Sequence, residues 1–298
     1  MTQWTTQKLL TWITDYLTTS GVDAPRLSAE LLLSHVLQLQ RIDLYTQFDK
    51  VVAPDHLTRL RELVKRAARH EPVAYLVGRT EFYSLPLEVD GHCLIPRPET
   101  ELLVQKAIEL LRTRSGTQYV CDLCTGCGCI AVAIAKNVPT AKVTATDISD
   151  AALAVAARNV ERHQLTDRVE LLCGNLFEPL VPHLDVTQWD LIVCNPPYVS
   201  AAEYETLDKN VRDYEPQLAL LAGADGLDVY RRIATDVDRY LRPGGTLLLE
   251  IGYAQGRAVR EMLEATNLFA EIAVEKDAGN NDRIVTARRT AGARDNGT

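Results

Sequence analysis

The four consecutive residues Asn195-Pro196-Pro197-Tyr198 combine groups that could hold a planar NH2 group and present it for reaction. They directly follow the apolar run 191–194, an expected strand. The Asn195 side chain can accept a hydrogen bond from an NH2 group. The Pro196 carbonyl can be a second acceptor, because two prolines stiffen the loop and offer no competing N–H. The set predicts methyl transfer to an amide or exocyclic amine nitrogen, although Asn-Pro and Pro-Pro also occur in simple turns.

A second candidate site lies upstream, where residues 118–123 predict a strand, 124–129 a tight turn and 130–136 a helix. Glycines in such a turn let the backbone approach a nucleotide or a sulfonium nucleoside closely. The next expected strand ends on Asp147, where the Rossmann arrangement places the acid that binds ribose hydroxyls. Asp122, at the mouth of the turn, would repel a pyrophosphate. The pattern favours S-adenosylmethionine, which carries a sulfonium and an amino group.

The turn also contains a cysteine series, Cys121, Cys124, Cys127 and Cys129, whose spacing is close to that of iron–sulfur ligands. Two observations oppose a metal centre. Glycines alternate with these cysteines at the positions of a cofactor loop, and Cys121 falls on the preceding strand. We therefore expect no metal, and thiols that stay reduced.

Composition limits the classes of partner. The 298 residues are 46% hydrophobic and 24% charged, with a formal net charge of −8. A net negative charge gives no sign of a phosphate-binding surface, which usually needs clustered Lys and Arg, and so disfavours direct binding of nucleic acid. No apolar run reaches the roughly 18 residues of a membrane span, and the first residues lack a signal-peptide pattern. We expect a cytoplasmic protein that does not contact a membrane.

The periodicity of apolar residues divides the chain. Residues 1–75 have helical spacing throughout and predict a small all-helical domain. Residues 76–97 predict a linker containing a β-hairpin, with a turn at Asp90-Gly91. Basic residues on the third expected helix form either a solvated face or a partner surface: Arg59, Arg61, Lys65, Arg66 and Arg69.

Residues 98–289 alternate between strand and helix patterns, which predicts an α/β fold with a largely parallel sheet covered by helices on both faces. The expected strands are 118–122, 142–146, 169–172, 190–194, 246–251, 270–275 and 284–288. The last two are close enough in sequence for an antiparallel hairpin at the sheet edge. The polar tail 290–298 is expected to be disordered.

The chain resembles the peptide chain release factor N5-glutamine methyltransferases (PrmC/HemK-type) along nearly its whole length. The Asn-Pro-Pro-Tyr tetrad is shared with adenine-N6 methyltransferases, so Arg97-Pro98-Glu99-Thr100 is the more discriminating match. The segments that carry the resemblance are 71–78, 95–100, 122–128, 195–198, 223–227 and 249–252.

The resemblance implies a Rossmann-like seven-stranded class I methyltransferase domain and an N-terminal helical domain that meets the protein substrate. It also implies methylation of the glutamine in the Gly-Gly-Gln motif of class 1 peptide chain release factors. S-adenosyl-L-methionine would be the methyl donor and S-adenosyl-L-homocysteine the product, without a metal. We expect a monomer.

The same resemblance assigns roles to individual residues. Asn195, Pro196, Pro197 and Tyr198 would hold the substrate glutamine and carry catalysis, with Asn195 also beside the cofactor. Glu99 and Thr100 either line the glutamine pocket or simply begin a helix, and Arg97 is expected to pair with an acid. The cofactor-binding residues would be Asp122, Cys124, Thr125, Gly126, Cys127, Gly128, Asp147, Asn175, Leu176 and Asn195.

Two positions depart from the family pattern. Cys124 stands where the family usually has glycine, which narrows the loop. Asn175-Leu176 replaces an acid followed by a bulkier or aromatic residue, although an asparagine can still bond the adenine amine.

Three other functions remain open at this point. An Asn-Pro-Pro-Tyr pocket suits a flipped adenine equally well, which would make the chain an adenine-N6 methyltransferase of nucleic acid. A glutamine in a ribosomal protein would need the same pocket chemistry. A protein that binds the cofactor without turnover is a third alternative.

Overall fold

The computed structural model describes residues 3–183 and 188–291. The chain divides into two compact units. Unit 1 comprises Met1–Arg79 and Asp208–Tyr214, and unit 2 comprises Thr80–Leu207 and Glu215–Thr298. Most of the tail that we expected to be disordered, from residue 292 onward, lies outside the described residues.

Unit 1 is helical, as the apolar periodicity of its sequence predicted. The Thr5 side chain accepts a hydrogen bond from the Lys8 N–H and caps the first helix, and prolines occupy the first position of the second and fourth. Leucines from four helices form the core of the unit, including Leu10, Leu32, Leu44 and Leu60. The helices are α1 (Thr6–Thr19), α2 (Pro25–Leu37), α3 (Arg41–Thr46), α4 (Pro54–Ala67), α5 (Val73–Val77) and α10 (Lys209–Arg212).

The α10 segment reaches unit 1 from far along the chain. The Tyr214 hydroxyl donates a hydrogen bond to the Arg69 carbonyl at 3.0 Å, which joins this segment to the end of the α4 region. Unit 1 therefore consists of two separate stretches of sequence.

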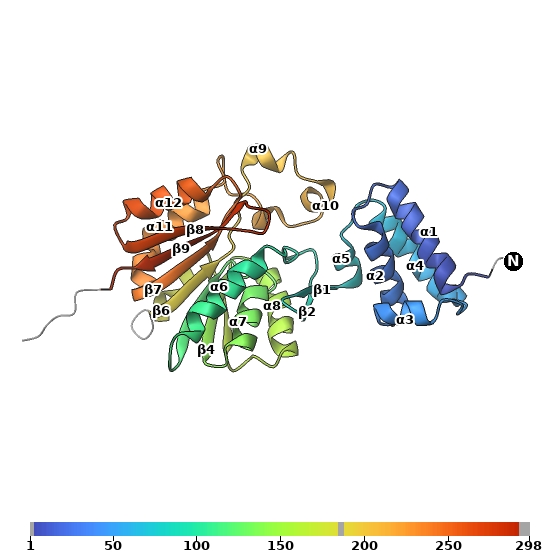
Figure 1. Cartoon of the computed structure of the whole chain (residues 1–298), viewed down its shortest axis with the longest axis horizontal. Coiled ribbons are helices and arrows are strands. Elements are labelled where there is room, and N and C mark those ends of the chain that lie inside the picture. Colours follow the sequence, from blue (N-terminus) through green and yellow to red (C-terminus); the bar gives the residue numbers. More distant parts are fainter. Residues whose placement is uncertain (1–2, 184–187, 292–298) are drawn as a thin grey trace, which may run out of the picture. The chain divides into compact units, whose positions relative to one another are not determined.

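Unit 2 is built on a seven-stranded sheet with the order β5-β4-β3-β6-β7-β9-β8 (Figure 1). The first five strands in this order are parallel, and β9 is antiparallel to both β7 and β8. All seven expected strands and the antiparallel edge hairpin are confirmed. The strands are β3 (Gln118–Leu123), β4 (Ala141–Asp147), β5 (Val169–Cys173), β6 (Trp189–Cys194), β7 (Leu241–Glu250), β8 (Phe269–Lys276) and β9 (Asp282–Arg289).

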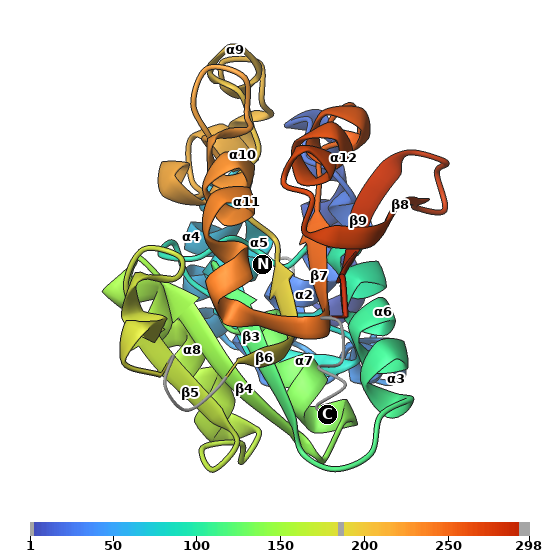
Figure 2. The ribbon, with the colours of Figure 1, turned by 90° about the vertical axis from the view of Figure 1, so that its left-hand side faces the viewer.

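Helices cover both faces of this sheet (Figure 2). On one side α6 contacts α7 and α7 contacts α8, while on the other α11 contacts α12. The central strand β6 is buried along its whole length, because it is covered on both faces. The helices of unit 2 are α6 (Thr100–Arg112), α7 (Cys129–Asn137), α8 (Asp150–Arg162), α9 (Ala201–Tyr204), α11 (Asp228–Tyr240) and α12 (Gly256–Ala265), with short 3-10 helices η1 (Glu178–His183) and η2 (Gln217–Ala219).

A small hairpin of β1 (Arg79–Phe82) and β2 (Leu85–Glu88) precedes the sheet. The chain reverses at Tyr83-Ser84, where φ is +51° and +58°, and not at Asp90-Gly91 as we predicted. Two positive φ angles match the twist of a hairpin, but such positions normally hold Gly or Asn, so Tyr83-Ser84 has no recognisable turn signature. Asp90-Gly91 instead lies in a turn after β2.

Candidate active site

A cavity of about 360 Å³ opens where β3, β4 and β6 end. The order of the sheet reverses here, since β4 and β5 extend to one side of β3 and β6 lies on the other. Ligands of open α/β sheets bind at such a switch point, and the volume lies in the range of small-molecule sites. Its lining includes Thr100, Cys124, Thr125, Gly126, Cys127, Asp147, Asn175, Leu176, Asn195 and Pro197 among the predicted residues.

The loop between β3 and α7 forms the floor of the cavity. Gly128 has φ +80°, and a Cβ there would lie 3.1 Å from the Ala156 Cβ, so a glycine permits the close approach of α8. Cys124 adopts φ +58°, the left-handed region that favours glycine, so a cysteine here has a backbone cost that a glycine would avoid. The Thr125 N–H donates to the Thr146 carbonyl at 2.9 Å and ties the loop to β4.

Asp122 supports this loop from beneath and does not line the cavity. One carboxylate oxygen accepts hydrogen bonds from the Thr125 hydroxyl at 2.6 Å and from the Ala131 N–H at 3.1 Å. The other oxygen, Oδ1, has no hydrogen-bond partner among the described residues. Burial raises the pKa of Asp122 to about 7, so the carboxyl group is held close to its point of titration.

Asp147 faces the cavity from the end of β4. Its Oδ2 accepts from the Gly126 N–H at 2.8 Å and its Oδ1 from the Ser149 N–H at 2.9 Å. Burial raises the pKa of Asp147 despite these bonds. Because each carboxylate oxygen has about two lone pairs, both keep capacity to accept bonds from a ligand's hydroxyl groups.

Asn175 and Leu176 lie on the far side of the cavity. The Asn175 Oδ1 accepts a hydrogen bond from Arg232 Nη1 at 2.9 Å, which turns the Asn175 amide NH2 away from that arginine. Leu176 has φ +54°, and its carbonyl accepts from the Thr146 hydroxyl at 3.1 Å. The oxygen expected to bond the adenine amine therefore already accepts one hydrogen bond from a cation and keeps a second lone pair.

The Asn195–Tyr198 loop follows β6, as predicted, and is held from two sides. Asn195 Nδ2 donates to the Thr100 hydroxyl at 3.1 Å. The Tyr198 carbonyl accepts from Gln255 Nε2 at 2.9 Å. A Cβ on Gly226 would lie 2.3 Å from that carbonyl oxygen, so only glycine fits against the loop. Pro196 is buried and the Tyr198 ring packs against the core beside β7, so neither side chain lines the cavity.

The Arg97–Thr100 segment begins α6 and is fixed by a buried acid. Arg97 Nη2 lies 2.6 Å from Glu215 Oε1, and the other Glu215 oxygen accepts from the Ile95 N–H at 3.2 Å. The expected pairing of Arg97 with an acid is confirmed. Glu99 is exposed and does not line the cavity, whereas Thr100 is buried and does.

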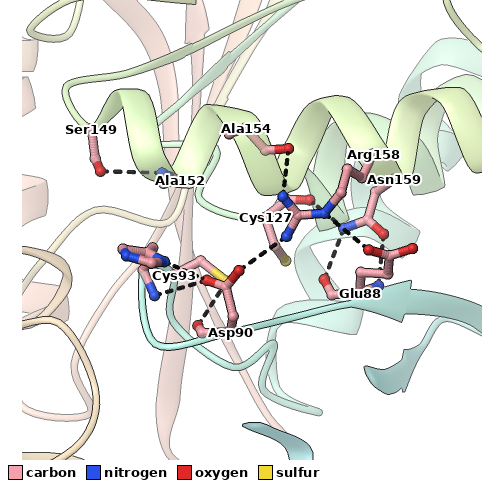
Figure 3. A network of polar contacts seen from close by, with 10 residues as sticks. Glu88, Asp90, Cys93, Cys127, Ser149, Ala152, Ala154, Arg158 and Asn159 are labelled. Atoms are coloured by element: carbon pink, nitrogen blue, oxygen red, sulfur yellow. Dashed lines mark hydrogen bonds and ion pairs between the residues drawn. The ribbon is translucent and has the colours of Figure 1, made fainter. Parts of the chain in front are cut away.

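The segment after the β1–β2 hairpin forms one wall of the cavity through His92, Cys93 and Leu94. It is tied to α8, as Figure 3 shows. Arg158 pairs with Glu88 at 2.9 Å and with Asp90 at 3.0 Å. Asn159, fully buried, bonds the Glu88 N–H and carbonyl at 2.7 and 2.9 Å and the Cys127 carbonyl at 2.9 Å. One side chain thus joins the hairpin to the loop that forms the cavity floor.

The cysteines at the cavity are thiols. The hydrogen bond with Cys127, together with burial, raises the pKa of Cys93, and burial raises the pKa of Cys121. Among residues 3–183 and 188–291, no group of three or more His, Cys, Asp or Glu side chains is arranged to hold a metal ion.

Several lining residues were not singled out from the sequence. Ile148 and Ser149 directly follow Asp147, so their position next to the acid was a usable signal. Other lining residues come from loops or helices without a motif: His92, Cys93, Leu94, Pro216, Leu218, Ala219, Leu221, Val229 and Arg232.

Comparisons with known proteins cover both units. Residues 8–78 match the family described as PrmC N-terminal domain, and residues 99–213 match that described as Methyltransferase small domain. The chain is 44% identical to the Release factor glutamine methyltransferase of Rhodopirellula baltica, over 97% of each chain. It is also 44% identical to the protein of that name from Geobacter sulfurreducens, over 96% of this chain and 97% of the relative.

A solved structure supports the fold independently. The hMettl16 catalytic domain, in complex with MAT2A 3'UTR hairpin 1, aligns with 95% of this chain and 92% of its own, with a TM-score of 0.59. At 16% sequence identity this likeness concerns the fold alone.

Proposed function

The chain belongs to the family of release factor glutamine methyltransferases, and from this premise we propose that it methylates the side-chain amide nitrogen (N5) of the glutamine in the Gly-Gly-Gln motif of class 1 release factors. The methyl donor is S-adenosyl-L-methionine, which leaves as S-adenosyl-L-homocysteine. The observation that carries the proposal is that Asn195 and Pro197 line the same cavity as Gly126 and Asp147. An amide-binding loop and a nucleoside-binding loop therefore meet at one place.

The cavity residues suit this donor. Both oxygens of Asp147 already accept backbone N–H bonds and retain lone pairs for ribose hydroxyls. Two acids, Asp147 half-buried at the cavity and Asp122 buried beneath the loop, disfavour a phosphate and suit a cationic ligand. When bound, S-adenosylmethionine supplies an electrophilic methyl carbon on a positively charged sulfur. Asn175 and Leu176 contact the adenine in this proposal, and Asn175 Oδ1 keeps a second lone pair for the adenine amine beside its bond from Arg232.

The residues of the Asn195–Tyr198 loop hold the substrate. An amide nitrogen is a weak nucleophile, since its lone pair is delocalised into the carbonyl. Acceptors at Asn195 Oδ1 and the Pro196 carbonyl bind the two N–H groups and direct the nitrogen toward the methyl group. Their partial negative charges stabilise the positive charge that grows on nitrogen in the transition state. The N–H proton becomes acidic only as the methyl group arrives, so neither a strong base nor a metal ion is needed.

We propose that unit 1 contacts the release factor. Among the five basic residues of the α4 region, Lys65 pairs with Glu62 at 3.0 Å, Arg66 pairs with Glu71, and Arg59 contacts His35 at 2.9 Å. These local partners favour a solvated face over a strongly basic docking surface. No helix in the described part of the chain is both long and apolar enough to cross a membrane. We place the reaction in the cytoplasm, where release factors act, with the enzyme as a monomer.

The test incubates the purified protein with methyl-labelled S-adenosylmethionine and separate candidate substrates. Label on an intact release factor, and none on its Gln→Ala variant, is the expected result. Label on ribosomal proteins or on DNA instead would overturn the assignment. Binding of the cofactor without label on any substrate would indicate the non-catalytic alternative.

A further inference from the structure

A chain of three side chains connects the substrate loop to a buried acid. Thr100 is the first residue of α6, Asn195 follows β6, and Glu250 ends β7. The Thr100 hydroxyl accepts from Asn195 Nδ2 at 3.1 Å. The Glu250 carboxyl group lies beside this hydroxyl, which favours its ionised form. Thr100 and Glu250 are each 1% exposed. The second carboxylate oxygen of Glu250, Oε2, is buried with no hydrogen-bond partner among the described residues.

The donor and acceptor capacities of these three groups favour one arrangement. A hydroxyl group has one proton and an ionised carboxylate can only accept, so ionised Glu250 draws the Thr100 proton toward itself. The lone pairs of the Thr100 oxygen then face Asn195, so they accept a hydrogen bond from its NH2 group and not from its oxygen end. Asn195 Oδ1 is consequently left for another partner.

Packing could not enforce this orientation, because the oxygen and NH2 ends of an asparagine amide have nearly the same size and shape. In the flipped state Asn195 would present its NH2 to the NH2 of a substrate glutamine. Two donors would then face each other, and the acceptor that the reaction requires would point at Thr100.

We propose that Thr100 and Glu250 are positioning residues that set which end of the Asn195 amide faces the substrate. The inference rests on the proposed function, since it explains how that site keeps its acceptor in place. Neither residue touches the reacting atoms.

The ionisation of Glu250 links this orientation to pH. Arg283 and Arg97 favour its anionic form and Glu99 opposes it, while the hydroxyls of Tyr198 and Tyr230 also lie near its charge. Burial raises the pKa of Glu250 to about 7. Below that pH the carboxyl group can donate to Thr100, whose proton becomes free to bond Asn195 Oδ1 and stabilise the flipped amide. The turnover number should therefore fall as pH decreases through about 7.

The test compares Thr100→Val, Thr100→Ser and Glu250→Gln at saturating cofactor and release factor. We expect Thr100→Val to lower kcat about 10- to 100-fold with the Kd for S-adenosylmethionine unchanged, because the acceptor is misoriented in a site that otherwise remains intact. Thr100→Ser keeps the hydroxyl and should stay within about 3-fold of wild type. Glu250→Gln should lower kcat and remove the fall between pH 8 and pH 6. The matched control is Thr246→Val, a buried threonine on the same strand as Glu250 that does not line the cavity.

Wild-type kcat in Thr100→Val, an equal loss in Thr246→Val, or an unchanged pH profile in Glu250→Gln would overturn the inference. A second readout does not depend on activity. In NMR spectra of protein labelled with 15N-asparagine, the side-chain NH2 signal of Asn195 is identified by its loss in Asn195→Ser. In Thr100→Val this signal should shift and its protons should exchange faster with solvent. In Thr100→Ser it should remain as in the wild type. An unaffected signal refutes the positioning role. A wild-type enzyme that fails to methylate release factors, with the signal behaving as expected, refutes only the proposed function.

Discussion

Replacing Gly226 by alanine tests whether the Asn195–Tyr198 loop is held by close backbone packing. The new Cβ would lie 2.3 Å from the Tyr198 carbonyl oxygen and 2.8 Å from Gln255 Nε2, at φ +76°. The left-handed backbone costs an alanine about 1–2 kcal/mol. Relief of the overlap costs about 1–3 kcal/mol more. We expect a total loss of about 2–5 kcal/mol in the free energy of unfolding of unit 2.

Gly244 provides the matched control. Its φ is +73°, but a Cβ there meets nothing within 4 Å. Gly244→Ala therefore has the same backbone penalty, and the same change in unfolded-chain entropy, without the overlap. The difference between the two variants, about 1–3 kcal/mol, isolates the contact with Tyr198.

The assay is urea denaturation followed by the fluorescence of Trp189. This tryptophan is buried in unit 2, and the other two, Trp4 and Trp12, are replaced by phenylalanine in every variant compared. Methyl transfer is measured in parallel. Displacement of the loop by the overlap should lower kcat of Gly226→Ala by about 10- to 100-fold, with Gly244→Ala close to wild type. Equal stability of the two variants, or full activity in Gly226→Ala, would refute this account of the loop.

Three further predictions concern single side chains. Asn195→Ala removes one preorganised acceptor and should lower turnover by about 10²–10³ at saturating cofactor, measured by label transfer; unchanged turnover would exclude the role given to Asn195. Burial raises the pKa of Asp122 to about 7, so its contribution to the free energy of unfolding is complete below the ordinary carboxyl pKa and is lost as pH rises toward 7. Asp122→Asn should flatten this decline in the free energy of unfolding, measured by urea denaturation between pH 4 and pH 8. The same decline in the variant and the wild type would contradict the raised pKa of Asp122. Arg97→Ala leaves the Glu215 carboxylate buried without its cation and should destabilise unit 2 by about 2–3 kcal/mol. This loss is smaller than that for breaking a fully buried ion pair, because Arg97 is partly exposed. The double variant with Glu215→Gln should recover part of the lost stability.

Local patterns were enough to predict the parts of the site that single segments build. The strand before Asp147, the glycine turn at 124–128 and the loop at Asn195 each depend on residues adjacent in sequence, where periodicity and turn chemistry act. The order of the seven strands then brings these segments together. The same reasoning gave the pairing of Arg97 with an acid, but it could not name Glu215, which lies far along the chain.

Contacts between distant segments account for what was missed. Arg232 bonds Asn175, and Asn159 joins the hairpin to the cavity floor, although no local pattern marks either residue. The turn at Tyr83-Ser84 adopts positive φ angles without Gly or Asn, so the tertiary fold overrides the local preference. Of the adjacent residues Glu99 and Thr100, only the threonine faces inward, a distinction that depends on how α6 begins.

The assignment of Asp208–Tyr214 to unit 1 bears on how this protein is made and divided. The ribosome must synthesise β3 to β6 before α10, the last helix of unit 1, exists. Unit 1 is therefore complete only after much of the sheet of unit 2 has emerged. No single cut in the chain can separate the two units cleanly. A fragment starting at Thr80 would carry α10 without the rest of its unit, and a fragment ending at Arg79 would lack the hydroxyl that bonds the Arg69 carbonyl.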